Sequence, residues 1–241
     1  MITVHLIPII PHNDNYAYIL AADNGEVAVV DPGEAQPFID FLENKSLKPN
    51  IILITHHHWD HIDGLGDMLD WHLCPVVGPA SETARIKPID ILLDESSAFS
   101  FGGEKVQILE TPGHTRGHIC FYFPKSGFLL AADTLFSMGC GRLFEGTPEQ
   151  MHTSLQKIAA LPDETLVYCG HEYTLGNAEF CLKHAPDNDA LKARYEEVKT
   201  LRDADKPTIP VTLETEKQTN LFLMAETAED FARLRALKDK A

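Results

Sequence analysis

The chain has 241 residues, which suits one sizeable domain or a main domain with a smaller appendage. A hydrophobic content of 44% is enough to bury a core, and no apolar run approaches the roughly 20 residues of a membrane-spanning helix. The formal net charge of −16 disfavours binding to nucleic acid or to anionic membranes, so we expect neither as a partner.

Cysteine usage and the amino terminus both favour the cytoplasm. The five cysteines form an odd number without close pairs, which fits reduced thiols better than a disulfide framework. No basic residue precedes the first apolar stretch, and Pro8 and Pro11 interrupt it, so a secretory signal is not expected. We expect a cytoplasmic monomer.

The first half of the chain predicts short strands bounded by turn residues, with two helices between them. The strands are residues 3–7, 16–21, 27–30, 51–54 and 75–78, and the helices are residues 37–44 and 63–71. A second series of strands, joined by Gly-rich turns, is predicted at residues 99–101, 106–110, 118–123 and 128–132. The pattern favours two sheets packed together with helices outside.

Helix signals dominate the rest of the chain. Thr147 is an N-cap candidate, with Pro148 at the first helical position and Gln150 at the capping-box position, which predicts a helix to about residue 160. After a last strand at residues 166–169, helices are predicted at residues 174–184, 189–203 and 228–238. We therefore expect a main domain over residues 1–172 and a small helical domain over residues 173–241.

The most informative segment runs from Thr55 to His61 and reads Thr-His-His-His-Trp-Asp-His, directly after a predicted strand. Burying several imidazoles and a carboxylate is costly unless a metal ion coordinates them. Alternate residues of an extended segment share a face, so His56 and His58 can bind one ion. A turn after them would direct Asp60 and His61 to a second ion.

Three further ligand candidates follow predicted strands: His114, Asp133 and His171. The resulting seven groups are too many for one tetrahedral ion but suit two ions that share a bridging carboxylate. The natural partition is His56, His58 and His114 on one ion and Asp60, His61 and His171 on the other, with Asp133 as the bridge. Imidazole and carboxylate accept zinc, iron or manganese, and we expect zinc first.

These motifs resemble those of the metallo-β-lactamase superfamily. The resemblance rests on residues 55–61, Pro112-Gly113-His114-Thr115, Asp133 and His171. Residues 139–146 (Gly-Cys-Gly-Arg-Leu-Phe-Glu-Gly) and 170–174 (Gly-His-Glu-Tyr-Thr) look like glyoxalase II, the hydroxyacylglutathione hydrolase family. The resemblance extends over the whole chain, to the Arg-x-x-Lys-Asp pattern at residues 235–239. The superfamily motifs are specific for the metal site, and the later motifs narrow the substrate.

The resemblance implies an α/β fold in which an αββα sandwich holds two divalent metal ions and a helical domain helps to bind glutathione. It also implies the ligand partition given above. The residues that it implies for contact with the glutathione moiety are Arg142, Phe144, Tyr173, Arg235 and Lys238. Some members carry Tyr where this chain has Phe144, so a hydroxyl contact to the substrate is not expected here.

The reaction that the resemblance implies is hydrolysis of S-D-lactoylglutathione, and of related 2-hydroxyacylglutathiones, to glutathione and D-lactate. This is the second step of methylglyoxal detoxification. A metal-bound hydroxide attacks the thioester carbonyl, and a metal polarises the carbonyl oxygen. Asp60 and the backbone around His61 orient the hydroxide, while Asp133 bridges the ions. A thiolate leaves readily, so a dedicated general acid is not required.

Three other functions compete with this hydrolysis. A persulfide dioxygenase of the same fold uses one iron ion on glutathione persulfide and needs fewer ligands than this chain offers. A nuclease of the superfamily needs a basic surface, which the net charge of −16 opposes. A structural zinc module is closed and usually rich in cysteine. Two ions per chain, rather than one, separate the hydrolase from the dioxygenase.

The remaining histidines and Trp59 are interpreted as structural. If residues 56–58 are extended, His57 points away from its neighbours, and Trp59 is expected to pack over the rim of the site. His118 opens a strand and is expected to pack rather than to react. The histidines assigned to the surface or to packing are His5, His12, His72, His152 and His184.

Replacing Asp133 by Ala is expected to release both ions and to abolish turnover, because this carboxylate is the predicted bridge. Replacing His57 by Ala is the matched control and is expected to leave most of the activity. Steady-state hydrolysis of S-D-lactoylglutathione by the two variants is the measurement. An equal loss in both would contradict the assignment of side-chain faces.

Overall fold

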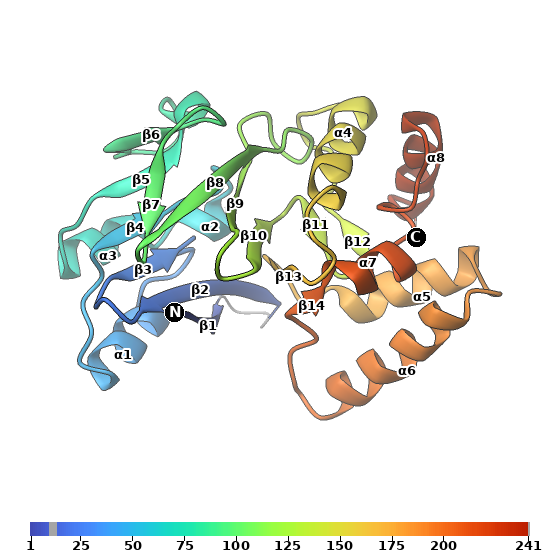
Figure 1. The fold of residues 1–241 in the computed structure, drawn as a ribbon, viewed down its shortest axis with the longest axis horizontal. Coiled ribbons are helices and arrows are strands. Elements are labelled where there is room, and N and C mark those ends of the chain that lie inside the picture. Colours follow the sequence, from blue (N-terminus) through green and yellow to red (C-terminus); the bar gives the residue numbers. More distant parts are fainter. Residues whose placement is uncertain (10–13, 241) are drawn as a thin grey trace. The chain divides into compact units, whose positions relative to one another are not determined.

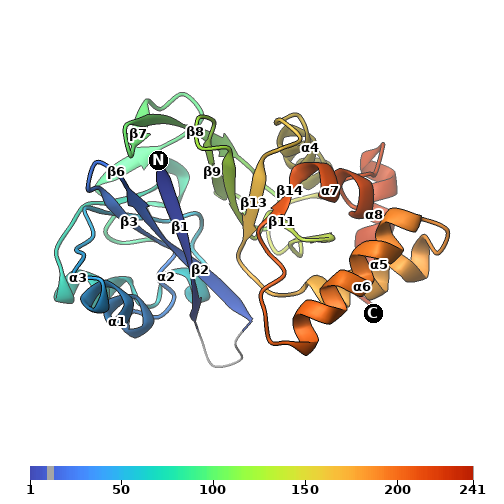
Figure 2. The ribbon, with the colours of Figure 1, turned by 60° about the horizontal axis from the view of Figure 1, so that its bottom comes forward.

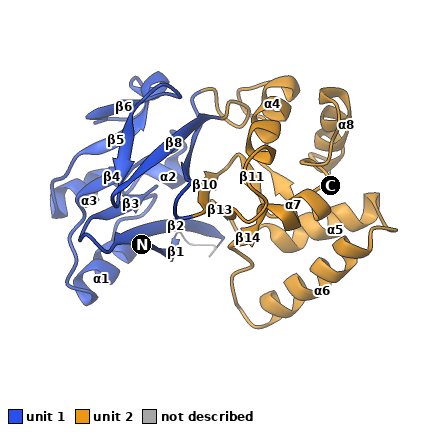
Figure 3. Cartoon of the chain, viewed as in Figure 1, with its two compact units in different colours: residues 1–110, 117–126 blue, residues 111–116, 127–241 orange. Residues whose placement is uncertain are grey.

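A computed structural model describes residues 1–9 and 14–240, so Pro11 and His12 lie outside the described residues. The chain divides into two compact units, which Figure 3 colours separately. Unit 1 comprises residues 1–110 and 117–126, and unit 2 comprises residues 111–116 and 127–241. Within the described part of the chain, no helix combines the length and apolarity needed to cross a bilayer.

Unit 1 is built on a six-stranded sheet in the order β1-β2-β3-β4-β5-β6. Its strands are β1 (Ile2–Ile9), β2 (Asn15–Ala22), β3 (Val27–Val30), β4 (Ile51–Leu53), β5 (Val76–Pro79) and β6 (Ile91–Leu93). Strands β1 to β3 pair antiparallel, whereas β3 to β6 pair parallel. Parallel neighbours end at the same edge of a sheet, so the residues that follow β3, β4 and β5 gather there.

Two helices cover one face of this sheet, α1 (Gln36–Asn44) and α3 (Leu65–Trp71), as Figures 1 and 2 show. Phe38 and Leu42 of α1 and Met68 of α3 are fully buried in one cluster with alternate residues of the strands. Every residue of β3 is buried, as expected of a strand that is covered on both faces.

Unit 1 also contains β7 (Phe99–Phe101), β8 (Glu104–Glu110) and β9 (Ile119–Phe123). Strand β8 pairs antiparallel with both β7 and β9. Buried and exposed residues alternate along the first part of β8, which is typical of a strand with one face on a core. The short helices α2 (Trp59–Ile62) and η1 (Ala80–Glu82) follow β4 and β5 along the chain.

The strands of unit 2 are β10 (Phe128–Ala132), β11 (Leu135–Phe136), β12 (Gly139–Cys140), β13 (Leu166–Cys169) and β14 (Val211–Thr212). Strand β10 pairs parallel with β13, β13 pairs antiparallel with β14, and β11 and β12 form a small hairpin. The amide of Gly170 donates to Ala132 O at 3.0 Å, so the chain leaves β10 and β13 side by side. Asp133 and His171 therefore emerge from neighbouring strand ends.

The helices of unit 2 are α4 (Pro148–Ala159), α5 (Thr174–His184), α6 (Asp189–Asp203), α7 (Leu213–Thr219) and α8 (Ala228–Lys238). Helix α4 lies beside α8, and α5 lies beside α6 (Figures 1 and 2). Phe222, between α7 and α8, stacks on Phe180 of α5 with 5.8 Å between ring centroids and meets Phe231 of α8 at 6.0 Å. These rings pack the carboxy-terminal helices together.

Most predicted elements are confirmed, and the differences have local causes. The helix predicted at residues 63–71 is confirmed as α3 but begins at Leu65, because the chain turns at Gly64. The Gly64 amide donates to Pro32 O at 2.9 Å, and a Cβ at Gly64 would lie 2.7 Å from that oxygen. The elements absent from the sequence prediction are α2, η1, β6, β11, β12, β14 and α7. All of them except α7 have two to four residues, which is too short for a clear periodic pattern.

All five cysteines are buried and reduced. Burial raises the pKa of Cys74, Cys140 and Cys181 to about 11 and the pKa of Cys169 to about 12. A cysteine reacts as its thiolate, so these four side chains stay protonated and unreactive at neutral pH.

The predicted capping box at the start of α4 is confirmed: Thr147 Oγ1 accepts from Gln150 N at 3.3 Å, and Gln150 Oε1 accepts from Thr147 N at 2.9 Å. Replacing Thr147 by Ala removes the first bond and is expected to lower the free energy of unfolding by about 1 kcal/mol. Chemical denaturation is the measurement. The matched control is Thr200→Ala on the exposed face of α6; an equal loss there would contradict a capping effect.

Candidate metal centre

Asp31 organises the half of the site that lies in unit 1. It follows β3, and Thr55 lies just beyond β4, so the parallel edge of the sheet brings them together. Asp31 Oδ1 accepts from Thr55 N at 2.8 Å, and Asp31 Oδ2 accepts from Thr55 Oγ1 at 2.7 Å. The same Oδ2 lies 3.0 Å from His61 Nδ1. One buried carboxylate thus fixes both the strand end and the His61 ring.

These contacts decide which ring nitrogen of His56 and of His61 carries the proton. The Thr55 hydroxyl gives its single proton to Asp31, so it accepts from His56 Nδ1, 3.0 Å away. An ionised carboxylate only accepts, so His61 Nδ1 is likewise a donor to Asp31. Both neutral rings therefore keep a lone pair on Nε2, which is the form that binds a metal.

The histidine rings of unit 1 gather around His56. Its centroid lies 4.8 Å from that of His58, 4.3 Å from that of His61 and 4.8 Å from that of His118, on which it stacks. The backbone at His58 is extended, with φ −62° and ψ 143°, in agreement with the shared face expected for His56 and His58. Ligand atoms of Asp31, His56 and His61 all lie within 4.8 Å of one another, so unit 1 carries a cluster that could hold a metal ion.

Asp60 is held by the start of β2. Asn15, the first residue of that strand and 4% exposed, donates from Nδ2 to Asp60 Oδ2 at 3.1 Å and to Asp60 O at 3.3 Å. Gly33 permits this arrangement, because a Cβ there would lie 1.9 Å from Asp60 O. The Asp60 carboxylate is placed 3.9 Å from His61 Nε2.

His57 takes a separate position, as the alternation along the segment predicts. Its Nδ1 lies 3.3 Å from Glu82 Oε2, and Arg85 Nη1 lies 3.2 Å from its Nε2. Glu82 is fully buried and also binds Arg85 through both oxygens, at 2.6 Å each. A Cβ at Gly117 would lie 2.1 Å from Glu82 Oε1, so only glycine fits there. The side chain of Trp59, for which the sequence predicts packing over the rim of the site, is exposed.

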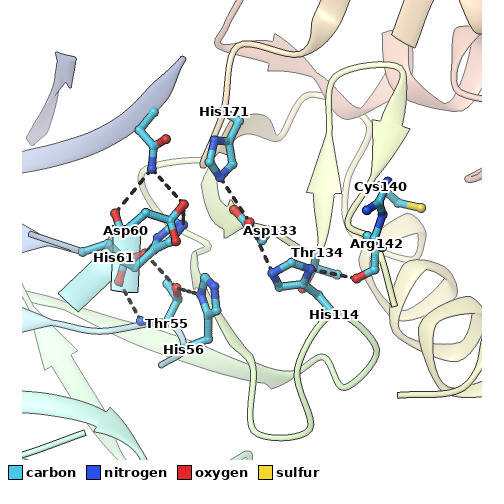
Figure 4. A network of polar contacts seen from close by, with 12 residues as sticks. Thr55, His56, Asp60, His61, His114, Asp133, Thr134, Cys140, Arg142 and His171 are labelled. Atoms are coloured by element: carbon cyan, nitrogen blue, oxygen red, sulfur yellow. Dashed lines mark hydrogen bonds and ion pairs between the residues drawn. The ribbon is translucent and has the colours of Figure 1, made fainter. Parts of the chain in front are cut away.

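In unit 2 two predicted histidine ligands converge on a carboxylate oxygen of a third predicted ligand, Asp133. Asp133 Oδ2 lies 3.3 Å from His114 Nε2 and 3.2 Å from His171 Nε2 (Figure 4). All three side chains are buried. The parallel pair β10 and β13 supplies Asp133 and His171, and the loop at residues 111–116 supplies His114.

The hydrogen bonding of His114 makes this half of the site fit a cation. His114 Nδ1 lies 2.8 Å from the carbonyl oxygen of Arg142, which can only accept, so Nδ1 carries the proton. A neutral His114 ring then turns its Nε2 lone pair toward Asp133 Oδ2, an arrangement that a shared cation stabilises. Gly141 allows the close approach, since a Cβ there would lie 2.0 Å from Asp133 O. This donor set fits zinc, iron or manganese.

The side chains predicted to contact the substrate all lie in unit 2. Two of them are exposed rings beside predicted ligands: Phe144 meets His114 edge-on at 5.3 Å, and Tyr173 stacks on His171 at 4.6 Å. The Arg142 side chain is 59% exposed. An exposed guanidinium can hold a carboxylate through two parallel hydrogen bonds.

Arg235 and Lys238 are engaged within unit 2. Buried Arg235 donates from Nη1 to Cys140 O at 3.1 Å, and its Nε and Nη2 lie 3.0 and 2.8 Å from Asp239 Oδ1. Asp239 Oδ1 also lies 3.5 Å from Arg142 Nε, so it joins the two arginines. Lys238 Nζ donates to a backbone carbonyl of α5 at 2.9 Å, and burial, aided by Arg235, lowers the pKa of Lys238. Their contact with substrate stays a prediction.

Sequence reasoning misses the groups that orient the ligands. Asp31 follows a predicted strand just as the ligand candidates do, so the strand-end pattern offered a signal for it. Thr55 stands inside the histidine segment, but its bond to His56 depends on the fold. Asn15 opens an apolar strand 45 residues before Asp60, and nothing local marks it as a partner.

Comparison with known proteins identifies the family. Residues 12–171 match the model of the Metallo-beta-lactamase superfamily, and residues 172–241 match that of the Hydroxyacylglutathione hydrolase C-terminus. A hydroxyacylglutathione hydrolase of Ruegeria pomeroyi is 44% identical over 242 residues, covering 94% of this chain and 95% of that protein. The chain belongs to the hydroxyacylglutathione hydrolase family. It is therefore a hydrolase of the metallo-β-lactamase superfamily, and the resemblance drawn from the motifs is confirmed.

Solved structures agree with this assignment of fold. The crystal structure of BLEG-1 B3 metallo-beta-lactamase has a TM-score of 0.71 and 26% identity, covering 92% of this chain and all of the other. TTHA1623 in a di-iron-bound form has a TM-score of 0.59 and 27% identity, covering 69% of this chain and 91% of the other. The predicted α/β metallo-β-lactamase fold with a carboxy-terminal helical region is confirmed. The predicted assignment to the hydroxyacylglutathione hydrolases is confirmed as well, and the chain has clusters of His and Asp that are able to bind metal.

Replacing Thr55 by Val keeps the shape of the side chain but removes the hydroxyl that joins Asp31 to His56. Losing a group that orients a metal ligand is expected to weaken metal binding about tenfold. Competition with a chromogenic chelator measures the affinity for zinc, and circular dichroism verifies the fold. The matched control is exposed Thr83→Val; an affinity unchanged in both variants would contradict the role assigned to Thr55.

Proposed function

We propose that the chain hydrolyses S-D-lactoylglutathione and related 2-hydroxyacylglutathiones to glutathione and D-lactate, using two divalent metal ions. One observation carries the proposal: the Nε2 atoms of His114 and His171 converge on one oxygen of Asp133 in a chain that matches both models of the family. The name of the relatives supports the same substrate class.

The proposed ligand sets follow the partition expected from the motifs. They are His56, His58 and His114 for one ion, Asp60, His61 and His171 for the other, and Asp133 as the bridge. The Nδ1 protons of His56, His61 and His114 support this proposal, because each is donated to a protein acceptor and Nε2 keeps its lone pair. The di-iron form of TTHA1623 supports two ions, while zinc remains our first choice and manganese an alternative.

When bound, the ions supply a nucleophilic water at neutral pH and polarise the thioester carbonyl. The residues of the chain orient the attacking water and the imidazole rings. Asn15 holds the Asp60 carboxylate, so Asp60 can accept a hydrogen bond from the attacking water and orient it. Asp31 and the carbonyl of Arg142 keep the imidazoles of His61 and His114 from rotating. The leaving thiol has a pKa near about 8.5, so it departs as a thiolate without a general acid from the protein.

Exposed groups of unit 2 suit glutathione, a tripeptide with two carboxylates. Arg142 offers a guanidinium for one of them, and the partly buried Lys238 offers an ammonium group that also donates to Gly176 O. Tyr173 and Phe144 offer ring surface, with no hydroxyl at Phe144. We propose that residues 173–241 form the substrate-binding domain and that residues 1–172 carry the chemistry.

The buried, reduced thiols suit a cytoplasmic setting. We propose that location for the enzyme, and a monomer as its working form. The proposed partner is the small-molecule thioester alone.

The test uses the full-length protein, stripped with a chelator and reconstituted with zinc, iron or manganese. Loss of thioester absorbance and release of one thiol per thioester are expected to return with metal, at two ions per chain by elemental analysis. No turnover with any of the three metals would overturn the proposal. Oxygen uptake with glutathione persulfide, by protein that holds one iron, would favour the dioxygenase instead.

Replacing Arg142 by Gln tests the proposed contact with the substrate. The change removes a positive charge but keeps the backbone carbonyl that fixes His114, so KM is expected to rise several-fold while kcat changes little. Arg233→Gln on the exposed face of α8 is the matched control. A fall in kcat with KM unchanged would assign Arg142 to the chemistry rather than to binding.

A further inference from the structure

In the sequence, the hairpin of β11 and β12 lies between two residues of the part of the candidate metal centre that belongs to unit 2. Before it comes Asp133, whose carboxylate faces His114 and His171. After it comes Arg142, whose carbonyl oxygen fixes the ring of His114. Gly141, directly after the hairpin, lies close to both Asp133 and His114. A shift of the hairpin would therefore move the predicted bridge and the group that orients a predicted ligand.

The backbone of this hairpin is held by side chains from residues 173–241. Five consecutive carbonyls accept from them: Phe136 O from Asn220 Nδ2 (3.2 Å), Ser137 O from Asn177 Nδ2 (3.1 Å), Met138 O from Cys181 Sγ (3.3 Å), Gly139 O from Asn220 Nδ2 (2.9 Å) and Cys140 O from Arg235 Nη1 (3.1 Å). Buried carbonyls left without donors are costly, so this set of donors selects one conformation of the hairpin.

Glu216 of α7 holds the tip of the hairpin. It is fully buried, and its Oε1 accepts from Ser137 Oγ at 2.8 Å. Its Oε2 accepts from Met138 N at 2.8 Å and from Asn220 Nδ2 at 2.9 Å. Met138 has φ +58°, a left-handed conformation that a long side chain rarely adopts, and the bond to its amide stabilises it. Burial raises the pKa of Glu216, and these hydrogen bonds oppose that rise.

The hairpin clamp is the set Asn177, Glu216, Asn220 and Arg235. We propose that the hairpin clamp is a positioning device for the metal centre, acting on Asp133 and His114 through the hairpin. The carboxy-terminal helices then set metal affinity in addition to binding substrate. This inference rests on the metal site of the proposed function.

Asn220 is the central member of the hairpin clamp, because it bonds two hairpin carbonyls and Glu216. The test is Asn220→Ala in the full chain, with zinc affinity measured by competition with a chromogenic chelator. Removing a group that orients metal ligands is expected to weaken zinc binding about tenfold. Thermal unfolding of the metal-stripped protein reports the loss of stability separately.

The matched control is Asn188→Ala. Asn188 caps α6, accepting from Leu191 N at 3.0 Å, and donates to Gln218 O of α7 at 3.0 Å, so its loss destabilises α6 and its contact with α7 without touching the hairpin. Its zinc affinity is expected to equal that of the wild type. A purely structural role for Asn220 would make the two variants alike: less stable, with zinc affinity unchanged. That result would overturn the proposal.

Two further outcomes are decisive. If wild-type protein binds no divalent ion, the proposed metal site fails and this inference fails with it. If wild-type protein binds zinc but Asn220→Ala does not fold, Ser137→Ala replaces it, since that change removes the bond to Glu216 and leaves the carbonyl bonds in place. Weaker zinc binding by Ser137→Ala would support the hairpin clamp, and unchanged binding would overturn it.

Discussion

The candidate site depends on where the Nδ1 protons of its buried imidazoles go. His56 donates to a threonine hydroxyl, His61 to the carboxylate of Asp31 and His114 to a backbone carbonyl. Three chemically different acceptors thus have one result, a ring whose orientation is fixed and whose Nε2 lone pair is available. Each acceptor is itself held by a strand end or a hairpin, so the fold and the chemistry are tied together at these nitrogens.

Parallel strand pairs explain why these groups lie together in each unit. In unit 1 the ends of β3, β4 and β5 place Asp31, the histidine segment and Glu82 at one edge. In unit 2 the ends of β10 and β13 place Asp133 beside His171. Ligands at such edges are mounted on buried, hydrogen-bonded strands, which is the rigid support that a metal site needs.

The predictable part of the site is the part with a local signature. A strand followed by histidine or aspartate marks the predicted ligands, and the longer elements have clear periodic or capping patterns. The residues that hold the hairpin lack such a signature: Glu216, in a helix of seven residues, and Asn220, the C-cap of that helix, act on a hairpin 78 to 84 residues away. Their roles arise from tertiary packing, to which local pattern is blind. The substrate class followed from resemblance, not from spacing.

The burial of the cysteines matters for an enzyme whose proposed product is a thiol. Thiol–disulfide exchange requires a thiolate and access to the sulfur, and the four thiols with raised pKa values offer neither in the folded chain. Mixed disulfides with glutathione, the proposed product, are therefore disfavoured at these four cysteines. At these four positions the fold therefore opposes S-glutathionylation, a modification that follows thiolate character and exposure.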